Sequence, residues 1–308
     1  MHDSLFITDG GLETDLIHHR GFDLPCFAAF TLLGDEEGTQ ALRDYYASYI
    51  DIAREHGVGA VFDTVTWRAN ADWGEELGYS AADLDAANRR AVALMMEIRE
   101  AHSGDVSFLI SGCVGPRGDA YSPDELMTAD EAASYHAPQI ATLADAGVDL
   151  VSALTLAYSA EAIGIARAAA QVGVPAVISF TVETDGRLPS GEELREAIEE
   201  TDAACDVPPA YYMVNCAHPT HFAHTFDDEG PWLERIRGVR ANASSKSHEE
   251  LDSSDELDEG DPADLAARYR ELLGRLPNLT VLGGCCGTDH RHVAQVCSVC
   301  VEALASDR

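Results

Sequence analysis

Two adjacent cysteines near the end of the chain are the residues whose chemistry most constrains the function. Cys285 and Cys286 lie within a Gly-Gly-Cys-Cys-Gly-Thr run that directly follows a short apolar segment. The flanking glycines let the backbone turn sharply, so both sulfur atoms could face the same point. A third thiol, Cys216, follows another apolar segment. Zinc accepts thiolate ligands, and a three-cysteine site would leave the fourth position for a substrate thiol.

The same cysteines allow two other interpretations. Cys285 and Cys286 could be small core residues, or they could form a disulfide between neighbours. If they bind zinc together with Cys216, a thiol at the fourth position would ionise near neutral pH. Our hypothesis is that one Zn2+ ion activates a substrate thiol without a further catalytic side chain. Its ligands would be Cys216, Cys285 and Cys286.

Histidines offer a competing metal site. Three of them follow Cys216 closely: His218, His221 and His224. Because histidine is a common zinc ligand, a zinc hydrolase with Cys/His ligands is an alternative function. We favour the simpler explanation, that these histidines belong to a solvent-facing helix start. The pair Cys297 and Cys300 belongs instead to an apolar stripe of the last expected helix, which indicates core packing.

Apolar segments alternate with amphipathic segments along the chain, which predicts strands alternating with helices. The expected strands are 6–8, 60–62, 106–111, 148–154, 175–180, 211–214, 239–242 and 279–282. The expected helices are 38–56, 84–102, 129–146, 160–171, 191–204, one ending at 231–237, 261–274 and 290–304. Gly57 should cap the first helix, and Pro138 should kink or shorten helix 129–146.

Strict alternation implies a parallel sheet, and eight strand–helix units suit a closed barrel. We therefore predict an α/β fold, a single (β/α)8 TIM barrel that forms one domain over residues 1–308. A doubly wound open sheet is the alternative, but no Gly-x-Gly-x-x-Gly follows the first strand. In a barrel, the loops after the strands form the active face. These loops carry the polar and glycine-rich clusters, among them Asp9-Gly10-Gly11, Thr155, Asn215 and the three cysteines.

Acidic residues dominate the charge of the chain. The chain has 54 Asp and Glu residues but only 20 Lys and Arg residues, which gives it a formal net charge of −34 at pH 7. Such a surface repels nucleic acid and anionic membranes, so neither is expected as a partner. We interpret the acid excess as adaptation to high salt, which screens the repulsion, rather than as a docking surface. The acidic segment 247–260 is expected to be a solvated loop.

Other features favour a cytoplasmic protein. No stretch approaches the roughly 20 apolar residues that span a bilayer, and the N-terminus lacks the basic and apolar regions of a signal peptide. Eight cysteines in a chain of 308 residues do not make a disulfide scaffold. Reduced thiols, available for a metal or for catalysis, are therefore expected.

Two motifs together resemble the homocysteine S-methyltransferase family: Asn215-Cys216 and the Gly-Gly-Cys-Cys-Gly-Thr run. The similarity begins at Asp9-Gly10-Gly11 and covers nearly the whole chain. The resemblance implies a zinc-dependent (β/α)8 barrel whose ligands are the three cysteines. It also implies methyl transfer from a sulfonium donor, S-methylmethionine or S-adenosylmethionine, to homocysteine, giving methionine. The short segment after the last expected strand leaves no room for a corrin-binding or folate-binding domain, which favours such a donor.

In the family, Asp9, Gly10 and Gly11 correspond to the residues that hold the amino-acid end of the substrate. Thr155 and Asn215 are the other candidates for substrate binding.

The sequence departs from the family pattern at two positions of this pocket. Leu154 replaces the Glu of a common Glu-Thr pair, so a carboxylate that helps to hold the substrate ammonium is missing. The run 63–66, Asp-Thr-Val-Thr, replaces a common Thr-Asn-Thr run. Glu183 or Asp63 could substitute for the lost carboxylate. A methyltransferase for another thiol is therefore an alternative, and the sequence leaves the donor and the oligomeric state open.

Overall fold

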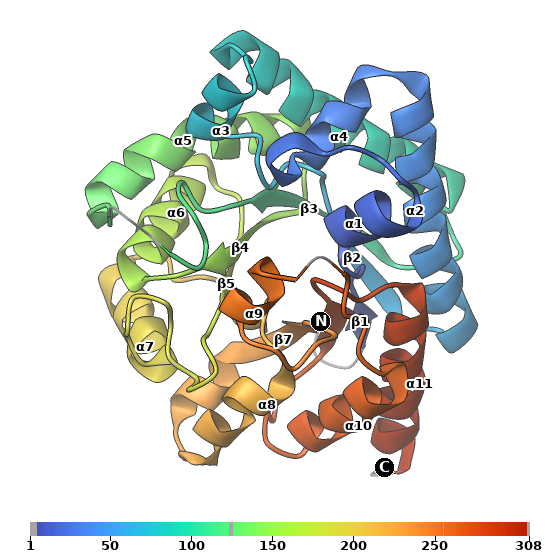
Figure 1. The fold of residues 1–308 in the computed structure, drawn as a ribbon. Helices are drawn as coiled ribbons and strands as arrows, with labels where there is room; N and C mark the ends of the chain where they lie inside the picture. The colour runs from blue at the N-terminus through green and yellow to red at the C-terminus, as the bar shows by residue number, and fades with distance from the viewer. Residues whose placement is uncertain (1–4, 123–125, 255, 307–308) are drawn as a thin grey trace.

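Eight parallel strands form a closed barrel in this computed structural model, which describes residues 5–122, 126–254 and 256–306. Each strand pairs with its neighbours in chain order, and β8 pairs with β1 to close the ring (Figure 1). The strands are β1 (Phe6–Ile7), β2 (Gly59–Asp63), β3 (Phe108–Val114), β4 (Leu150–Leu156), β5 (Ala176–Phe180), β6 (Tyr211–Asn215), β7 (Ile236–Ala241) and β8 (Val281–Gly284). The predicted single (β/α)8 barrel is therefore confirmed.

Helices surround the barrel (Figure 1). The α-helices are α1 (Leu12–Thr14), α2 (Glu36–His56), α3 (Ala71–Glu76), α4 (Ala81–Ala101), α5 (Ala129–Ala146), α6 (Ser159–Val172), α7 (Leu194–Ala204), α8 (Pro219–Phe222), α9 (His248–Asp252), α10 (Pro262–Leu273) and α11 (His290–Ser306). Gly57 ends α2 in the left-handed conformation, φ 65°, as predicted. Helix 129–146 is confirmed as α5, and of the two effects expected from Pro138 the early end is wrong, because α5 continues through this residue while packed against α6.

Two strands continue through glycines that suggested strand ends in the sequence. β3 continues through Gly112 to Val114, and β8 continues through Gly283 and Gly284. A Cβ atom on Gly112 would lie 3.0 Å from Leu143 Cδ1, and one on Gly283 would collide with Thr8. Glycine is therefore retained in these strands for close packing, and β8 leads directly into the cysteine pair.

The region before β7 also differs from the prediction. Residues Pro231–Arg235 form a short 3-10 helix, and β7 begins at Ile236, where the end of a helix was expected. Gly238 interrupts the apolar pattern and so concealed the strand. A Cβ atom at Gly238 would lie 2.6 Å from Met213 Cγ on β6, so the close approach of these two strands requires glycine there.

The segment 247–260 is more than the solvated loop that we predicted. It begins with α9, whose N-terminus is a capping box between Ser247 and Glu250. His248 is buried, and its Nε2 hydrogen-bonds the carbonyl oxygen of Cys216 at 2.6 Å. In Figure 1, α9 lies in front of the barrel strands. This segment therefore covers the mouth of the barrel beside the cysteines.

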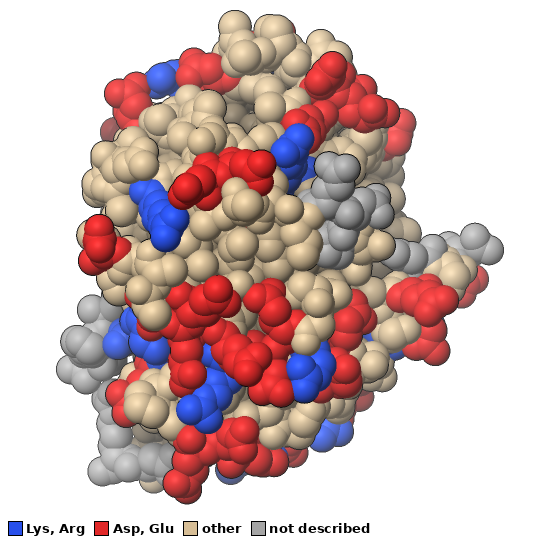
Figure 2. Space-filling view, turned by 90° about the vertical axis from the view of Figure 1, so that its left-hand side faces the viewer, with Lys and Arg blue, Asp and Glu red and all other residues tan. Residues whose placement is uncertain are grey.

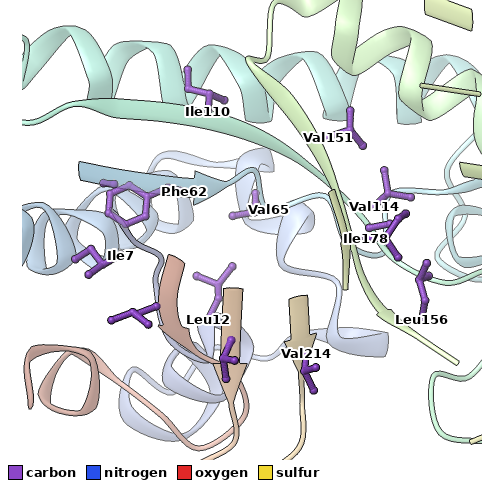
Figure 3. Close-up of a cluster of buried hydrophobic side chains, with 14 of the residues drawn as sticks. Ile7, Leu12, Phe62, Val65, Ile110, Val114, Val151, Leu156, Ile178 and Val214 are labelled. Atoms are coloured by element: carbon purple, nitrogen blue, oxygen red, sulfur yellow. The ribbon is translucent and has the colours of Figure 1, made fainter. Parts of the chain in front are cut away.

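Two hydrophobic clusters follow the alternation of side chains along the strands. Phe6, Val177 and Met213 belong to the smaller cluster, which draws on strand residues and fills the inside of the barrel. Their strand neighbours belong to the larger cluster, which also contains helix residues and joins the barrel to the helices. Figure 3 shows part of this larger cluster, including Ile7, Phe62, Ile178 and Val214. The packed barrel holds the strand ends, and with them the site, in fixed positions.

None of the described helices is long and apolar enough to cross a membrane. The face in Figure 2 carries many more acidic than basic side chains, as the composition predicts.

Because like charges crowd this surface, we expect salt to stabilise the fold. The Debye length falls from about 10 Å at 0.1 M to about 3 Å at 1 M salt. We predict a rise of about 10 °C in the midpoint of thermal unfolding between these KCl concentrations, since each kcal/mol of relieved repulsion adds about 2–4 °C. Sucrose at matched osmolality is the control, because it does not screen charge. An equal rise in sucrose would contradict the electrostatic explanation.

Candidate metal and substrate site

Three cysteine sulfurs meet at the carboxyl ends of β6 and β8, the two strands that flank β7. The Sγ atoms of Cys216, Cys285 and Cys286 all lie within 4.8 Å of one another. Cys216 directly follows β6, and the other two follow β8. Because parallel strands end on the same face of a barrel, the fold delivers all three thiols to one point. The cysteines predicted as metal ligands are thus brought together.

The spacing of one pair of these sulfurs fits a tetrahedral thiolate site. Two sulfurs that bind one zinc ion at about 2.3 Å lie about 3.8 Å apart, and Cys216 Sγ lies 3.9 Å from Cys286 Sγ. A disulfide joins Cys216 to Cys285, with the Cα atoms 5.4 Å apart. The disulfide considered from the sequence, between neighbouring Cys285 and Cys286, is therefore not the one formed. Since metals bind thiolates, this disulfide must be reduced before the three cysteines can hold an ion.

Thr155 and Asn215 lie directly behind the sulfurs. Thr155 Oγ1 donates to Cys216 Sγ and Asn215 Nδ2 donates to Cys285 Sγ, each at 3.8 Å. The two residues also bind each other, through Asn215 Nδ2 to Thr155 Oγ1 at 2.8 Å and Thr155 N to Asn215 Oδ1 at 2.9 Å. Such donors orient ligands and stabilise thiolate charge. These contacts are with cysteines, and the substrate-binding role of Thr155 and Asn215 stays a prediction.

Two residues beside the cysteine cluster have an unusual backbone conformation. Thr155 has φ 65° and Cys216 has φ 55°, both in the left-handed region. This conformation costs about 1–3 kcal/mol for a residue other than glycine and persists where the surrounding structure enforces it. Here, the hydrogen bonds between Thr155 and Asn215 hold the irregular end of β4, where its pairing with β5 shifts register between Ala153 and Leu156. Nothing in the residue types predicted these two positions.

A buried ion-pair network forms the floor beside the cysteines. Arg240, on β7, donates from Nη2 to Asp9 Oδ1 at 2.6 Å and from Nη1 to Asp63 Oδ2. Its Nε donates to the carbonyl oxygen of Gly284, and Tyr45 donates to Asp9 Oδ2 at 3.2 Å. Burial raises the pKa of Asp9 to about 6, although the Arg240 charge opposes the rise. The network therefore ties the ends of β1, β2, β7 and β8 together.

A cavity of about 480 Å³ lies above these groups. It is lined by all eight residues predicted for the site: Asp9, Gly10, Gly11, Thr155, Asn215, Cys216, Cys285 and Cys286. A Cβ atom on Gly11 would lie 2.6 Å from the carbonyl oxygen of Cys285, so glycine is required where the segment after β1 passes the cysteine loop. Leu251 and Leu257, from the segment that covers the barrel mouth, also line the cavity.

Glu13 also lines this cavity, two residues beyond Gly11. Burial raises the pKa of its carboxyl to about 7, and the nearby Asp9 charge adds to the shift, while Arg240 and Arg68 oppose it. The folded protein therefore binds a proton at Glu13 at pH values where the unfolded chain has released it.

This shift predicts how stability depends on pH. Because the pKa of Glu13 rises from 4.5 to about 7 on folding, its contribution is complete below pH 4.5 and declines as the pH rises to about 7. Over that window the free energy of unfolding should fall by up to about 3 kcal/mol more in the wild type than in Glu13→Gln. Urea titrations of both proteins at several pH values, in constant KCl, measure the difference. Parallel curves would contradict the raised pKa of Glu13 in the folded protein.

Other candidates from the sequence lie elsewhere. Among the described residues, no histidine belongs to the cysteine cluster. His221 hydrogen-bonds the carbonyl oxygen of Ser245, and burial lowers the pKa of His218 to about 4. Glu183 pairs with His248 in a separate hollow, whereas Asp63 lines the main cavity. The Cys297 and Cys300 pair is fully buried in α11, as the predicted core packing requires.

Sequence reasoning missed several charged residues of this cavity, among them Glu13, Arg68 and Arg240. Arg240 did carry a signal, because a charged residue inside an expected barrel strand must find a buried partner. Glu13 lay within the motif that begins at Asp9, and Arg68 follows Trp67 in the loop after β2. Their common cavity depends on the barrel closing and was not visible from spacing.

Comparison with known proteins places this geometry in context. A sequence model described as "Homocysteine S-methyltransferase" matches residues 6–300. The chain is 23% identical over 307 residues to homocysteine S-methyltransferase 1 of Brassica oleracea var. italica, covering 92% of this chain and 89% of that protein. It is 25% identical over 212 residues to homocysteine S-methyltransferase of Escherichia coli strain K12, covering 63% of this chain and 64% of that one.

Solved structures agree on the fold. The homocysteine methyltransferase MmuM from Escherichia coli, in its oxidized form, superposes with a TM-score of 0.73 at 22% identity, covering 99% of this chain and 96% of that one. Its metallated form gives a TM-score of 0.72, with 96% of each chain covered. The sequence match over nearly the whole barrel, which includes the cysteine motifs, decides the family. The chain belongs to the homocysteine S-methyltransferase family and is a methyltransferase.

Proposed function

We propose that this protein is a zinc-dependent S-methyltransferase that moves a methyl group from a sulfonium donor to a thiol, with homocysteine as the acceptor and methionine as the product. The observation that carries the proposal is the meeting of three cysteine sulfurs, within 4.8 Å of one another, on the wall of one cavity. Thiolates favour soft or borderline metal ions such as zinc. A reducing compartment, the cytoplasm, would keep the cysteines available.

The residues around the cysteines suit such a site. Cys216, Cys285 and Cys286 would hold zinc, which when bound supplies a Lewis acid that lowers the pKa of the acceptor thiol. Thr155 and Asn215 orient the ligand sulfurs. Leu251 and Leu257 add apolar surface to the cavity wall, and the removal of water when substrate binds there would strengthen the electrostatic interactions inside it.

The charge of the cavity favours a cationic donor. Six carboxylate residues line it, Asp9, Glu13, Asp63, Asp119, Glu256 and Asp258, against two arginines, Arg68 and Arg240. A sulfonium ion carries positive charge and is attracted to such a cavity. In the reaction, the acceptor loses its thiol proton and its sulfur attacks the methyl carbon. The donor carbon–sulfur bond breaks, and the donor sulfur keeps the electron pair as a neutral thioether.

The test is methyl transfer by reduced, zinc-loaded protein in molar KCl. Homocysteine is supplied with S-methylmethionine or with S-adenosylmethionine, each carrying an isotopically labelled methyl group, and labelled methionine is measured by mass spectrometry. The proposal predicts labelled methionine with at least one donor, and none after the zinc is chelated. Other thiols are assayed in parallel to decide the acceptor. Failure to methylate any thiol, in protein that holds zinc, would overturn the proposal.

A further inference from the structure

We propose that Glu13 and Arg68 form a two-point clamp for the amino-acid end of the acceptor, with Glu13 binding its ammonium group and Arg68 its carboxylate. The inference deepens the proposed function and rests on it, since homocysteine carries both groups beside its thiol. The two residues come from different loops, after β1 and after β2, and both line the cavity that holds the cysteines.

Glu13 is the carboxylate that this cavity leaves available. Within the described part of the chain, its side chain forms no hydrogen bond or ion pair with another side chain. Asp9 and Asp63 differ, because both are bound by Arg240. Glu13 is also partly accessible, whereas Asp9 and Asp63 are buried. An incoming ammonium group could therefore pair with Glu13 without breaking an existing salt bridge.

Arg68 is a buried cation without a carboxylate ligand in the described residues. Its guanidinium lies between the rings of Trp67 and Trp73, 4.0 and 3.9 Å from their centroids. One hydrogen bond runs from Nη1 to the carbonyl oxygen of Gly118 at 3.3 Å, and the buried Nε has no partner. A buried charge is costly unless it is paired. The two rings hold the guanidinium rigidly, which suits it to bind a carboxylate that the substrate supplies.

The two charges face the same space without touching. Burial lowers the pKa of Arg68 to about 10, and the charges of Asp119 and, less strongly, Glu13 oppose that shift. Burial likewise dominates the shift in the pKa of Glu13, and the Arg68 charge opposes it. No salt bridge joins them in the described structure. Both charges line one cavity, and an α-amino acid zwitterion carries complementary charges on two groups bonded to the same carbon. The substrate ammonium would therefore pair with Glu13, and the substrate carboxylate would pair with Arg68.

Both residues are anchored near the thiols. The turn that carries Glu13 packs on the cysteine loop, where Gly287 N donates to Thr14 Oγ1 at 3.2 Å. On the other side, Trp67 Nε1 donates to the carbonyl oxygen of Leu154 at 3.3 Å. Leu154 itself lines the cavity and supplies no charge. Glu13 thus supplies this cavity with a carboxylate, whereas Leu154, which stands where the family commonly has Glu, supplies none.

The test combines two variants with two truncated substrates. Glu13→Gln and Arg68→Gln each remove one charge. Homocysteine is compared with its analogue that lacks the amino group and its analogue that lacks the carboxylate. We expect Glu13→Gln to lower kcat/KM by about 10–100-fold for homocysteine and for the analogue that keeps the amino group, but not for the other analogue. Arg68→Gln should lower kcat/KM for homocysteine and for the analogue that keeps the carboxylate, but not for the analogue that lacks it.

Controls separate binding from structural damage. Glu75→Gln removes an exposed carboxylate on α3 and should behave as the wild type. Zinc content and the thermal unfolding midpoint show whether each variant is folded and loaded, and Arg68→Lys tests whether charge without the planar fork suffices. The proposed clamp would be contradicted if either variant lowered kcat/KM equally for homocysteine and both analogues. It would also be contradicted if neither variant lowered kcat/KM for homocysteine. If the wild type methylates no thiol at all, the proposed function is contradicted. If the wild type is active but the variants show no selective loss, only the clamp is contradicted.

Discussion

Substitution of Cys286 by serine is expected to abolish bound zinc and to lower methyl transfer by at least about 1,000-fold. A hydroxyl is a poor zinc ligand, and the site has only three cysteines within reach of one another among the described residues. A Lewis acid supplies several kcal/mol of stabilisation in the transition state, and each 1.4 kcal/mol corresponds to about tenfold in rate. Cys286 is the informative choice, because it is not part of the disulfide between Cys216 and Cys285.

The matched control is Cys26→Ser, since Cys26 does not line the cavity. That variant should keep both the zinc and the activity. The measurement is kcat/KM for homocysteine together with zinc per chain, in protein kept reduced throughout. A Cys286→Ser enzyme that retains zinc and full activity would show that another group completes the site.

Arg240→Met should be the most destabilising single change at the site. It leaves Asp9 and Asp63 buried beside each other without their shared cation. Removal of one partner from a buried ion pair costs roughly 3–5 kcal/mol. Loss of the Arg240 charge also raises the pKa of Asp9 further above its present value of about 6, so the variant should be least stable at alkaline pH.

Urea unfolding in molar KCl, at pH values on both sides of 6, measures this effect. Arg240→Lys keeps the charge but not the two-armed contact, and should fall between the wild type and Arg240→Met. The triple variant Asp9→Asn, Asp63→Asn, Arg240→Met removes all three charges and should recover part of the stability. If Arg240→Met alone were as stable as the wild type, the network would not hold the strand ends together.

Much of the fold was predictable because each barrel unit repeats the same local pattern. Apolar strands and amphipathic helices are local properties, and the cap at Gly57 follows from one residue. Errors arose where contacts between distant segments overrule the local pattern. Gly238 and Gly283 interrupt the apolar pattern of their strands, yet both are fixed there by neighbouring strands. α9 was missed, although its Ser247 and Glu250 capping box was visible in the sequence.

The site was predictable to the same limited degree. Residues that share a motif, such as Cys285 and Cys286, could be singled out, and the barrel brought Cys216 to them. The charged cavity could not be predicted, because Glu13, Arg68 and Arg240 lie in separate parts of the chain. Their arrangement depends on how α1, the loop after β2 and strand β7 converge when the barrel closes. The absence of a carboxylate at Leu154 was evident from the sequence, whereas the position of Glu13 on the same cavity was not.

Zinc per chain is the measurement that tests the central claim most directly. Wild-type protein is reduced in molar KCl, freed of metal, offered zinc, dialysed and analysed by mass spectrometry of the metal. A parallel sample is first oxidised to close the disulfide between Cys216 and Cys285. The three-thiolate site predicts one zinc ion per reduced chain and none per oxidised chain. A folded, reduced protein that binds no zinc, or an oxidised one that binds as much, would contradict it.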